Sequence, residues 1–259
     1  MAAEIPLSFV SSLADSASKA IMPHFRAVLA VDDKGGGRFD PVTVADRAAE
    51  RAMRALINAT YPHHGIIGEE FGSEHADAEY VWVLDPIDGT RSFITGIPLW
   101  GVLIGLLQNG RPVLGMMAQP FTGERYSGDG RHAWYAGPDG EHPLTTRACA
   151  SLGQASLFTT TPALFNGADR AAYDRVEAAV RMPRYGTDCY GYCRVAAGSA
   201  DLVVETGLQT YDVAALIPIV EGAGGRFTSW EGGPATAGGR VVASGDPKLH
   251  DEVLALLAG

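Results

Sequence analysis

The stretch YVWVLDPIDGT, residues 80–90, joins a short apolar run to two carboxylates. Tyr80–Leu84 is typical of a buried strand, because it is apolar and is bounded by polar or breaker residues. A proline and a glycine force a turn directly after it, so Asp85 and Asp88 are expected to point into one cavity and to share hard cations. The alternative is that both aspartates cap a following helix, and this stretch alone leaves the two interpretations open.

The next two residues, Gly89 and Thr90, are expected to begin a helix with free backbone N–H groups. Such groups, together with the helix dipole, bind phosphate well. The stretch therefore predicts a phosphate group held beside a cation.

The chain has 259 residues, with 20 Lys and Arg against 30 Asp and Glu and a formal net charge of -10. This charge repels nucleic-acid backbones and anionic membrane surfaces, and no run rich in Lys or Arg offsets it. We therefore expect no nucleic-acid partner and no membrane partner. A negative protein still binds a phosphate ester when bound cations reverse the local field, which favours metal-mediated binding.

Three further carboxylates lie at the expected ends of helices or strands. Glu69 follows the apolar run Gly65–Gly68, at a strand exit where α/β folds place their ligand sites. Asp46 lies near the start of one expected helix, and Asp212 opens another. Taken singly, Glu69 is typical of solvated surface, and helix capping explains the two aspartates.

Taken together, these segments resemble the motifs of one family in order and spacing. Gly68-Glu69-Glu70, residues 85–90 and Asp212-Val213-Ala214-Ala215 match the Gly-Glu-Glu, Asp-Pro-Ile-Asp-Gly-Thr and Asp-x-Ala-Ala motifs of the inositol monophosphatase family. The resemblance covers residues 40–225. It implies an α/β (α+β) fold, a layered αβαβα sandwich, and metal-dependent hydrolysis of a small phosphate monoester. One departure is Tyr211, where the family usually has Trp, another large aromatic with a polar tip.

The resemblance also implies a set of metal ligands. Glu69, Asp85 and the carbonyl of Ile87 resemble the first metal site, and Asp85, Asp88 and Asp212 resemble the second. A third, weaker ion near Glu69 is usual in the family, so two to three Mg²⁺ ions per site are expected, with Mn²⁺ left open as an alternative. Carboxylates gathered in one cleft repel each other, and bound cations remove that repulsion.

Catalytic roles follow from the same resemblance. Thr90 and Asp46, together with Glu69, look like the group that orients and deprotonates the attacking water. Asp88 and the amides of Gly89 and Thr90 look like the group that holds the substrate phosphate. A nucleophilic Ser or Cys is not required, because two metal ions activate a water and neutralise the leaving oxygen.

The segment Tyr185–Tyr192 and the run Asp201–Glu205 look most similar to the histidinol-phosphatase branch of the family. L-Histidinol phosphate carries an ammonium and an imidazole, so its pocket is expected to place carboxylates against the leaving group. Asp188 and Glu205 are the candidates, and a helix cap before Tyr190 is the alternative for Asp188. The expected activity is Mg²⁺-dependent hydrolysis of L-histidinol phosphate, a step of histidine biosynthesis.

Other activities stay open. An inositol-1-monophosphatase is the runner-up within the family. A nucleotide 3′-phosphatase or a sugar bisphosphatase needs a basic cluster for a second phosphate, which Arg184, Arg194 or a partner subunit would have to supply. A non-catalytic metal-binding relative is disfavoured, because every residue assigned to metal and water chemistry is present.

Glycines and prolines between residues 137 and 143 predict a boundary in the chain. Residues 1–145 are expected to form an N-terminal α+β part that carries most of the metal ligands. Residues 146–259 are expected to form a C-terminal α/β part that completes the metal and substrate site. The family resemblance implies a homodimer. Three cysteines make no disulfide framework and the start lacks a basic segment, which favours the cytoplasm.

Hydrophobic periodicity predicts helices over 7–25, 43–60, 168–182, 190–197, 211–221 and 247–257. In the helix over 43–60, the apolar stripe is assigned to Val44, Ala48, Ala52, Ala55, Leu56 and Ala59, and the wet face to Arg47, Glu50, Arg51 and Arg54. Asn109-Gly110 predicts a tight turn between strands over 100–107 and 112–118. Further strands are expected over 65–68 and 80–84, near 125, 132 and 156–160, over 201–205, and near 227 and 241.

Overall fold

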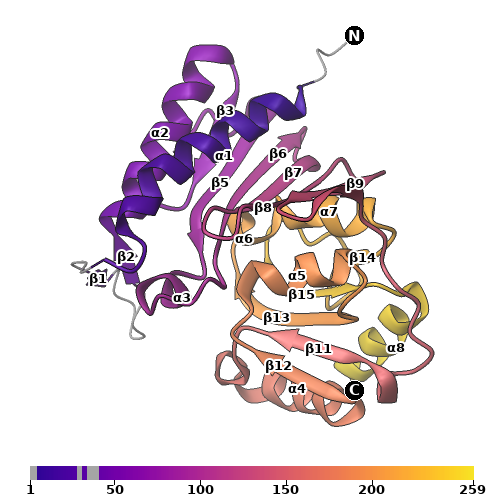
Figure 1. Cartoon of the computed structure of the whole chain (residues 1–259). Helices are drawn as coiled ribbons and strands as arrows, with labels where there is room; N and C mark the ends of the chain where they lie inside the picture. Colours follow the sequence, from indigo (N-terminus) through magenta and orange to yellow (C-terminus); the bar gives the residue numbers. More distant parts are fainter. Residues whose placement is uncertain (1–4, 28–30, 34–40) are drawn as a thin grey trace.

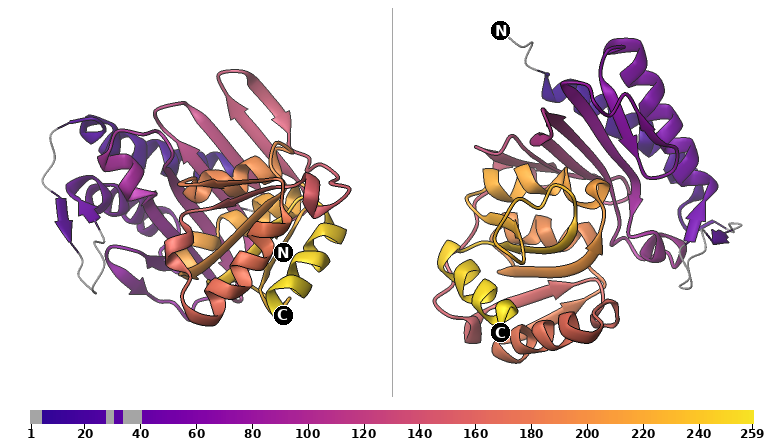
Figure 2. Two further views of the ribbon diagram at one scale, coloured as in Figure 1. Left: turned by 90° about the horizontal axis from the view of Figure 1, so that it is seen from below. Right: turned by 180° about the vertical axis from the view of Figure 1, so that it is seen from behind.

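The computed structural model describes residues 5–27, 31–33 and 41–259. Two helices, an eight-stranded sheet, a middle layer of helices, a five-stranded sheet and two outer helices follow one another (Figure 1). The views from below and from behind show the same succession of layers (Figure 2). This arrangement confirms the α/β class and the αβαβα sandwich predicted from the motifs.

The outer layer on the N-terminal side packs against the larger sheet. Helix α1 spans Leu7–Ile21, is followed by a 3-10 turn over Met22–His24, and packs beside α2, Val44–Thr60. The helix predicted over 7–25 therefore ends earlier, at Ile21, and Pro23 lies in the 3-10 turn that follows it. A two-stranded ladder of β1, Val31–Asp33, and β2, Pro41–Thr43, leads into α2.

Helix α2 buries a different face from the predicted one. The predicted stripe residues Val44 and Leu56 are 49% and 36% exposed. The buried apolar residues lie one position further along, at Ala45, Ala49, Met53 and Ile57, and Glu50, assigned to the wet face, is fully buried among them. Alanines on several sides of the helix made the apolar face ambiguous, and two of the polar partners of Glu50, the N–H groups of Glu70 and Phe71, come from another part of the chain.

The larger sheet has the strand order β10-β9-β8-β7-β6-β5-β3-β4. Its strands are β3 Gly65–Gly68, β4 Gly72–Glu74, β5 Tyr80–Asp88, β6 Gly101–Gln108, β7 Arg111–Gln119, β8 Glu124–Gly128, β9 Ala133–Gly137 and β10 Gly140–Pro143. The predicted hairpin is confirmed as β6–β7, and both turn residues, Asn109 and Gly110, have positive φ. Strands β3 and β5 are parallel, so the residues that follow them emerge at the same edge of the sheet.

The smaller sheet has the order β12-β11-β13-β15-β14. Its strands are β11 Ser156–Thr159, β12 Met182–Tyr185, β13 Leu202–Leu208, β14 Arg226–Ser229 and β15 Gly239–Ser244. Helices α5, Asp188–Ala196, α6, Thr210–Val213, and α7, Leu216–Gly222, lie between the two sheets. Helices α4, Gly167–Ala179, and α8, Pro247–Ala258, cover the outer face. The chain passes from one sheet to the other between β10 and β11, and the division at residue 145 stays a prediction.

Two predicted helices have different bounds. The helix expected over 168–182 ends at Ala179, because Pro183 cannot continue it and the N–H groups of Arg181 and Met182 bond to the carbonyl of Ala155. The helix expected over 211–221 is split into α6 and α7. Pro218 lies in the first turn of α7, where a missing N–H costs least.

The junction between α6 and α7 rests directly on the larger sheet. A Cβ added to Gly115 in β7 would lie 1.9 Å from the carbonyl oxygen of Ala215. Gly105 in β6 also lies close to this junction, because an added Cβ would lie 3.0 Å from the backbone carbon of Ala214. These glycines let the helix that carries Asp212 approach the strand layer that carries Asp85. No helix in the described ranges is both long and apolar enough to cross a membrane.

Candidate functional site

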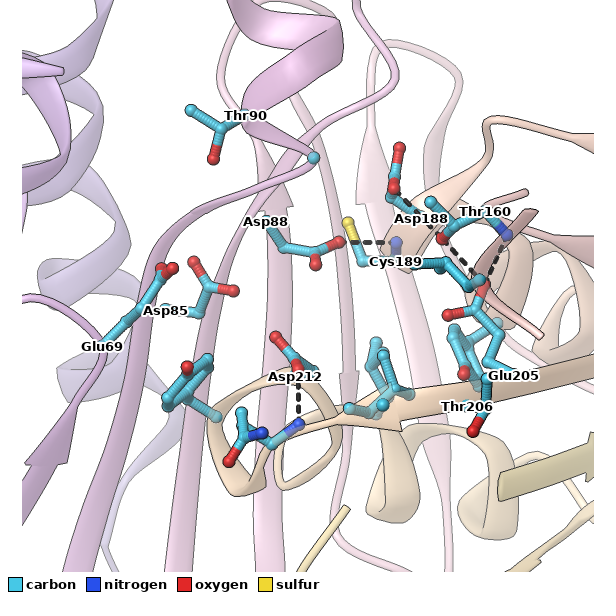
Figure 3. A pocket seen from close by; sticks show the side chains of 18 of the residues that line it. Glu69, Asp85, Asp88, Thr90, Thr160, Asp188, Cys189, Glu205, Thr206 and Asp212 are labelled. Atoms are coloured by element: carbon cyan, nitrogen blue, oxygen red, sulfur yellow. Dashed lines mark hydrogen bonds between the residues drawn. The ribbon is translucent and has the colours of Figure 1, made fainter. Parts of the chain in front are cut away.

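A cleft of about 560 Å³ opens where the end of β5 meets the start of α5, the end of β13 and helix α6. Seven carboxylates line it: Glu69, Asp85, Asp88, Asp169, Asp188, Glu205 and Asp212. Figure 3 shows that Glu69, Asp85, Asp88 and Asp212 gather in one part of the cleft, while Asp188, Thr160 and Glu205 form a second group. We call the group of Glu69, Asp85, Asp88 and Asp212 the first wall, or metal wall, of the cleft. We call the group of Asp188, Thr160 and Glu205 the second wall.

The first wall brings together the residues predicted from three separated motifs. One carboxylate oxygen from each of Asp85, Asp88 and Asp212 lies within 4.8 Å of the others. Asp85 and Asp88 belong to β5, where the register against β6 shifts between them, and Asp212 belongs to α6. Three oxygen donors at this spacing fit a hard divalent cation.

Backbone N–H groups hold each of the three carboxylates in place. The N–H of Ile87 donates to Oδ1 of Asp85 at 3.0 Å, and the N–H of Cys189 donates to Oδ2 of Asp88 at 2.6 Å. The N–H of Gln209 donates to Oδ2 of Asp212 at 2.6 Å, in a capping box of α6. The capping alternative for Asp212 is thus part of the structure, and it fixes the side chain in the cleft rather than directing it elsewhere.

Burial and mutual repulsion raise the pKa values of two acids in this wall, Asp85 and Asp88. Burial raises the pKa of Asp85 well above its usual range, and the charges of Glu69, Asp88 and Asp212 add to the shift. Burial likewise raises the pKa of Asp88, with further contributions from Asp188 and Asp212. Cations placed among these oxygens relieve the repulsion, so the donor set fits divalent metal binding.

The turn after the first wall has the geometry expected of a phosphate-binding backbone. Gly89 has φ of 85°, and an added Cβ would lie 2.8 Å from the carbonyl oxygen of Leu99, so only glycine fits there. Thr90 begins the short helix α3, Thr90–Ile94, and its hydroxyl donates to the carbonyl of Ile87 at 3.1 Å. That carbonyl keeps a second lone pair, so this bond leaves room for the predicted metal ligation by Ile87.

Asp46 lies outside the lining of the cleft, unlike the other predicted site residues. It is buried at the start of α2, where its Oδ2 accepts the N–H of Thr43 at 2.8 Å and the hydroxyl of Thr43 at 2.6 Å. Burial raises its pKa, Thr43 opposes this shift, and the charge of Glu69 adds to it. The hydrogen bonds of Asp46 in the structure are therefore those of a helix cap, which was the alternative interpretation of this residue. Its pairing with Thr90 stays a prediction.

The second wall of the cleft is a pair of acids, the half-buried Asp188 and the buried Glu205, joined by one threonine. The hydroxyl of Thr160 lies 2.8 Å from Oε1 of Glu205 and 3.2 Å from Oδ1 of Asp188 (Figure 3). The backbone N–H of Thr160 also donates to Oε1 of Glu205 at 2.7 Å. Asp188 begins α5 with a positive φ of 44°, and Thr187 takes the N-cap position. Asp188 is therefore not the N-cap of α5, which was the alternative interpretation of this residue.

This second wall holds two acids that oppose each other's ionisation. Burial raises the pKa of Glu205 to about 8, and the charge of Asp188 adds to the shift while Thr160 opposes it. Burial also raises the pKa of Asp188, against hydrogen bonding to Thr160 and the charge of Arg91. A cationic group entering between them would favour the ionised form of both.

Sequence reasoning missed Glu50, which holds the strand exit that carries Glu69. Its Oε2 accepts the N–H of Glu70 at 2.7 Å, and its Oε1 accepts the N–H of Phe71 at 3.3 Å and Nε of Arg54 at 2.8 Å. A Cβ on Gly68 would lie 1.9 Å from Oε1 of Glu50, so the carboxylate fills the space beside the strand. Glu50 and Arg54 stand four residues apart, a helical ion-pair spacing that was the available signal.

A layered fold with paired acidic walls around one cleft defines a class of metal-dependent phosphate ester hydrolases. The chain belongs to the inositol monophosphatase family, whose model matches residues 6–258. It is a phosphatase acting on small phosphate esters, in a family that depends on metal ions.

Relatives with two kinds of name match the chain over most of its length. It is 44% identical to the bifunctional phosphatase IMPL2 of Arabidopsis thaliana, over 94% of this chain and 72% of that protein. It is 37% identical to a histidinol-phosphatase of Mycobacterium tuberculosis, over 97% of each. It is 36% identical to the inositol-1-monophosphatase ImpA of Mycolicibacterium smegmatis, over 95% of this chain and 90% of that protein. A solved inositol monophosphatase from Zymomonas mobilis superposes with a TM-score of 0.87 at 42% identity, over 97% of each chain.

Replacing Glu50 tests whether it positions the metal wall. Glu50→Ala removes the acceptor for the N–H groups of Glu70 and Phe71, so we expect the Mg²⁺ concentration for half-maximal activity to rise by roughly 10-fold or more. Glu50→Gln retains an acceptor oxygen and is expected to lie between Glu50→Ala and the unaltered protein. Mn²⁺ affinity, measured by electron paramagnetic resonance, gives a second readout.

The matched control is Glu252→Ala, which removes an exposed glutamate from α8. It is expected to leave both metal constants unchanged. A folded Glu50→Ala protein with the metal constants of the unaltered chain would show that Glu50 does not position Glu69.

Proposed function

We propose that the chain is a Mg²⁺-dependent histidinol-phosphatase, which hydrolyses L-histidinol phosphate to L-histidinol and phosphate in histidine biosynthesis. The observation that carries the proposal is the acid pair of the half-buried Asp188 and the buried Glu205, which Thr160 bridges in the same cleft as the metal wall. The alcohol part of L-histidinol phosphate carries an ammonium and an imidazole that titrates near neutrality. Relatives named histidinol-phosphatase, which are 34–37% identical to this chain, support the same substrate.

The second candidate is an inositol-1-monophosphatase, which the similarity to ImpA and to the Zymomonas mobilis structure favours. Inositol phosphate presents only neutral hydroxyls away from its phosphate. Two buried carboxylates pay a desolvation cost that hydroxyl groups offset less well than a cation does. The acid pair therefore favours histidinol phosphate over inositol phosphate. A nucleotide 3′-phosphatase, a sugar bisphosphatase and a non-catalytic relative lack a specific observation in their favour.

In this proposal the metal wall holds two to three Mg²⁺ ions. Glu69, Asp85 and the carbonyl of Ile87 would hold the first, Asp85, Asp88 and Asp212 the second, and Glu69 would take part in a third, weaker site. Bound Mg²⁺ would supply positive charge against the phosphoryl group and the leaving oxygen and would lower the pKa of the attacking water.

The side chains and amides of the cleft do the positioning. The backbone N–H groups of Gly89 and Thr90 would hold the phosphate oxygens, because Gly89 is the N-cap of α3 and the first amides of a helix have no acceptor within it. Asp88 would act on the phosphate through the ion that it ligates. Glu69 and the hydroxyl of Thr90 would orient the attacking water and accept its proton, with Asp46 supporting them from the start of α2. Asp188 and Glu205 would bind the ammonium of the leaving alcohol and so set its direction of departure.

We also propose that the chain acts in the cytoplasm as a homodimer, and that residues 1–145 and 146–259 form two parts that complete the site together. The family resemblance and the cysteine usage support these assignments. Light scattering coupled to size-exclusion chromatography measures the mass in solution, and a monomeric mass at working concentrations would reject the dimer.

Removing charge from the metal wall is expected to abolish activity without unfolding the protein. Asp88→Asn, Asp212→Asn and Glu69→Gln should each lower kcat/KM by at least about 100-fold, because each removes charge that holds the ions. Asp88→Asn keeps an acceptor for the N–H of Cys189 and relieves repulsion. Its thermal midpoint in EDTA is therefore expected to exceed that of the unaltered protein.

The unaltered protein should be inactive in EDTA, regain activity with Mg²⁺ and lose it in Ca²⁺, which tolerates irregular coordination. Phosphate release and differential scanning fluorimetry measure these outcomes. Turnover that persists in chelator-treated, metal-free protein would reject the metal-dependent mechanism, as would normal activity of Asp88→Asn at saturating Mg²⁺.

Asp188→Asn tests the substrate. It is expected to raise KM for L-histidinol phosphate by about 10-fold, because it removes the charge of one acid that binds the ammonium. KM for glycerol phosphate, an ester without a cation, should change much less. Asp174→Asn, which alters an exposed aspartate on α4, is the control and should change neither constant. Equal losses on both esters, or a preference of the unaltered protein for inositol phosphate in competition, would reject the substrate assignment.

A further inference from the structure

Tyr192 carries a buried hydroxyl for which the described part of the chain provides no partner. The side chain belongs to α5 and lines the cleft between the two acidic walls. Its ring stacks on Phe227, with ring centroids 5.2 Å apart and ring planes 14° apart, so the ring is held rigidly. Among the residues that the structure describes, the phenol oxygen makes no hydrogen bond. Buried polar groups nearly always have a partner, so an exception in a ligand cleft indicates a group that the ligand satisfies.

The neighbouring tyrosine in the same helix gives the contrast. The hydroxyl of Tyr190 donates to the carboxylate of Glu124 and lies 3.4 Å from the hydroxyl of Thr122, on the side of α5 that faces β8. Tyr190 does not line the cleft. The two tyrosines stand two residues apart in α5. Of the two, only Tyr192 lines the cleft, and only its hydroxyl lacks a hydrogen-bond partner among the described residues.

The surroundings of the Tyr192 hydroxyl select the kind of ligand group. Burial raises its pKa well above the usual range, and the charges of Glu205, Asp88 and Asp212 add to the shift in that order. The phenol therefore stays protonated at neutral pH, and the charged groups around it are hydrogen-bond acceptors. Its oxygen lone pairs accept no hydrogen bond from the described residues and can therefore accept one from a ligand that brings N–H donors.

The low exposure of Tyr192 is shared by other residues that line the floor of the cleft. Tyr192, Glu205 and Asp85 are each 2% exposed, and all three line the cleft. A ligand group that reaches Glu205 on this floor therefore enters the part of the cleft that Tyr192 also lines.

We propose that the Tyr192 hydroxyl is a specificity-determining contact for the alcohol part of the substrate, accepting an N–H from the cationic group that Asp188 and Glu205 draw into the cleft. The inference rests on the proposed function, because it takes the leaving alcohol to be cationic. It assigns to Tyr192 a role in substrate binding only, with metal binding and water activation left to the opposite wall.

The test is Tyr192→Phe, which removes the hydroxyl and keeps the ring on Phe227. We expect KM for L-histidinol phosphate to rise by about 10-fold, with KM for glycerol phosphate within about 2-fold of its original value. Binding of the product L-histidinol, measured by calorimetry with Mg²⁺ and inorganic phosphate present, should weaken by a similar factor. The thermal midpoint should not fall, because the lost hydroxyl had no partner in the unliganded protein.

The matched control is Tyr190→Phe, which removes the hydroxyl bonded to Glu124. It is expected to lower the thermal midpoint and to leave KM for both esters unchanged. An unchanged KM and product affinity in Tyr192→Phe would overturn the proposal and leave the hydroxyl to a buried water. Equal changes for both esters would also overturn it, because the effect would then lie in the metal or phosphate part of the site.

Hydrolysis of L-histidinol phosphate by the unaltered protein tests the proposed function separately from the role of Tyr192. If that protein does not hydrolyse L-histidinol phosphate, the substrate assignment is rejected and the contact with a cation is overturned with it. If it does hydrolyse L-histidinol phosphate, the comparison of Tyr192→Phe with Tyr190→Phe decides the role of the hydroxyl alone.

Discussion

Mutual repulsion among carboxylates in one cleft is the constraint on which the rest of the structure depends. Asp85, Asp88 and Asp212 come from β5 and α6, elements far apart in sequence, and their oxygens meet within 4.8 Å. Such an arrangement needs rigid support, because each charge favours moving away from the others. The support is a backbone N–H for each carboxylate, with the buried Glu50 fixing the strand exit before Glu69. Gly105 and Gly115 bring the α6–α7 junction onto the sheet.

The cleft separates two tasks between its walls. The wall built from β5 and α6 presents hard oxygen donors and a glycine turn, groups that suit any phosphate ester with divalent cations. The wall built from α5, β11 and β13 presents Asp188, Thr160 and Glu205, together with Tyr192. In the proposed binding mode these side chains would face the alcohol part of the ester, which differs between substrates. The fold therefore allows a constant phosphoryl chemistry to be combined with different leaving alcohols by changes on one wall.

Much of this architecture followed from the sequence. The apolar run before Glu69 was predicted as a strand, which β3 confirms, and the Asn109-Gly110 turn placed the β6–β7 hairpin. The strand predicted to end at Leu84 instead continues to Asp88 as β5, with a shift of register between Asp85 and Asp88. Spacing of the motifs identified the family and hence the layered fold. These features depend on local sequence or on motifs, so they can be predicted from the sequence alone.

The remaining features depend on contacts between distant segments. The buried face of α2 was misassigned because alanines lie on several sides of the helix and because Glu50 finds its partners at residues 70 and 71. The break between α6 and α7 arises where the helix meets glycines of two strands. Thr160, which bridges Asp188 and Glu205, is distant from both in sequence, and nothing near it in the chain marks it. The roles of the site residues, including Asp46, stay predictions.

The most direct measurement of the central claim is the anomalous scattering from a crystal of the protein grown with Mn²⁺ and phosphate. The account predicts two to three anomalous peaks, the strongest among the carboxylates of Glu69, Asp85, Asp88 and Asp212, with phosphate oxygens toward the amides of Gly89 and Thr90. Full occupancy of phosphate in the cleft without an anomalous peak among these carboxylates would contradict it.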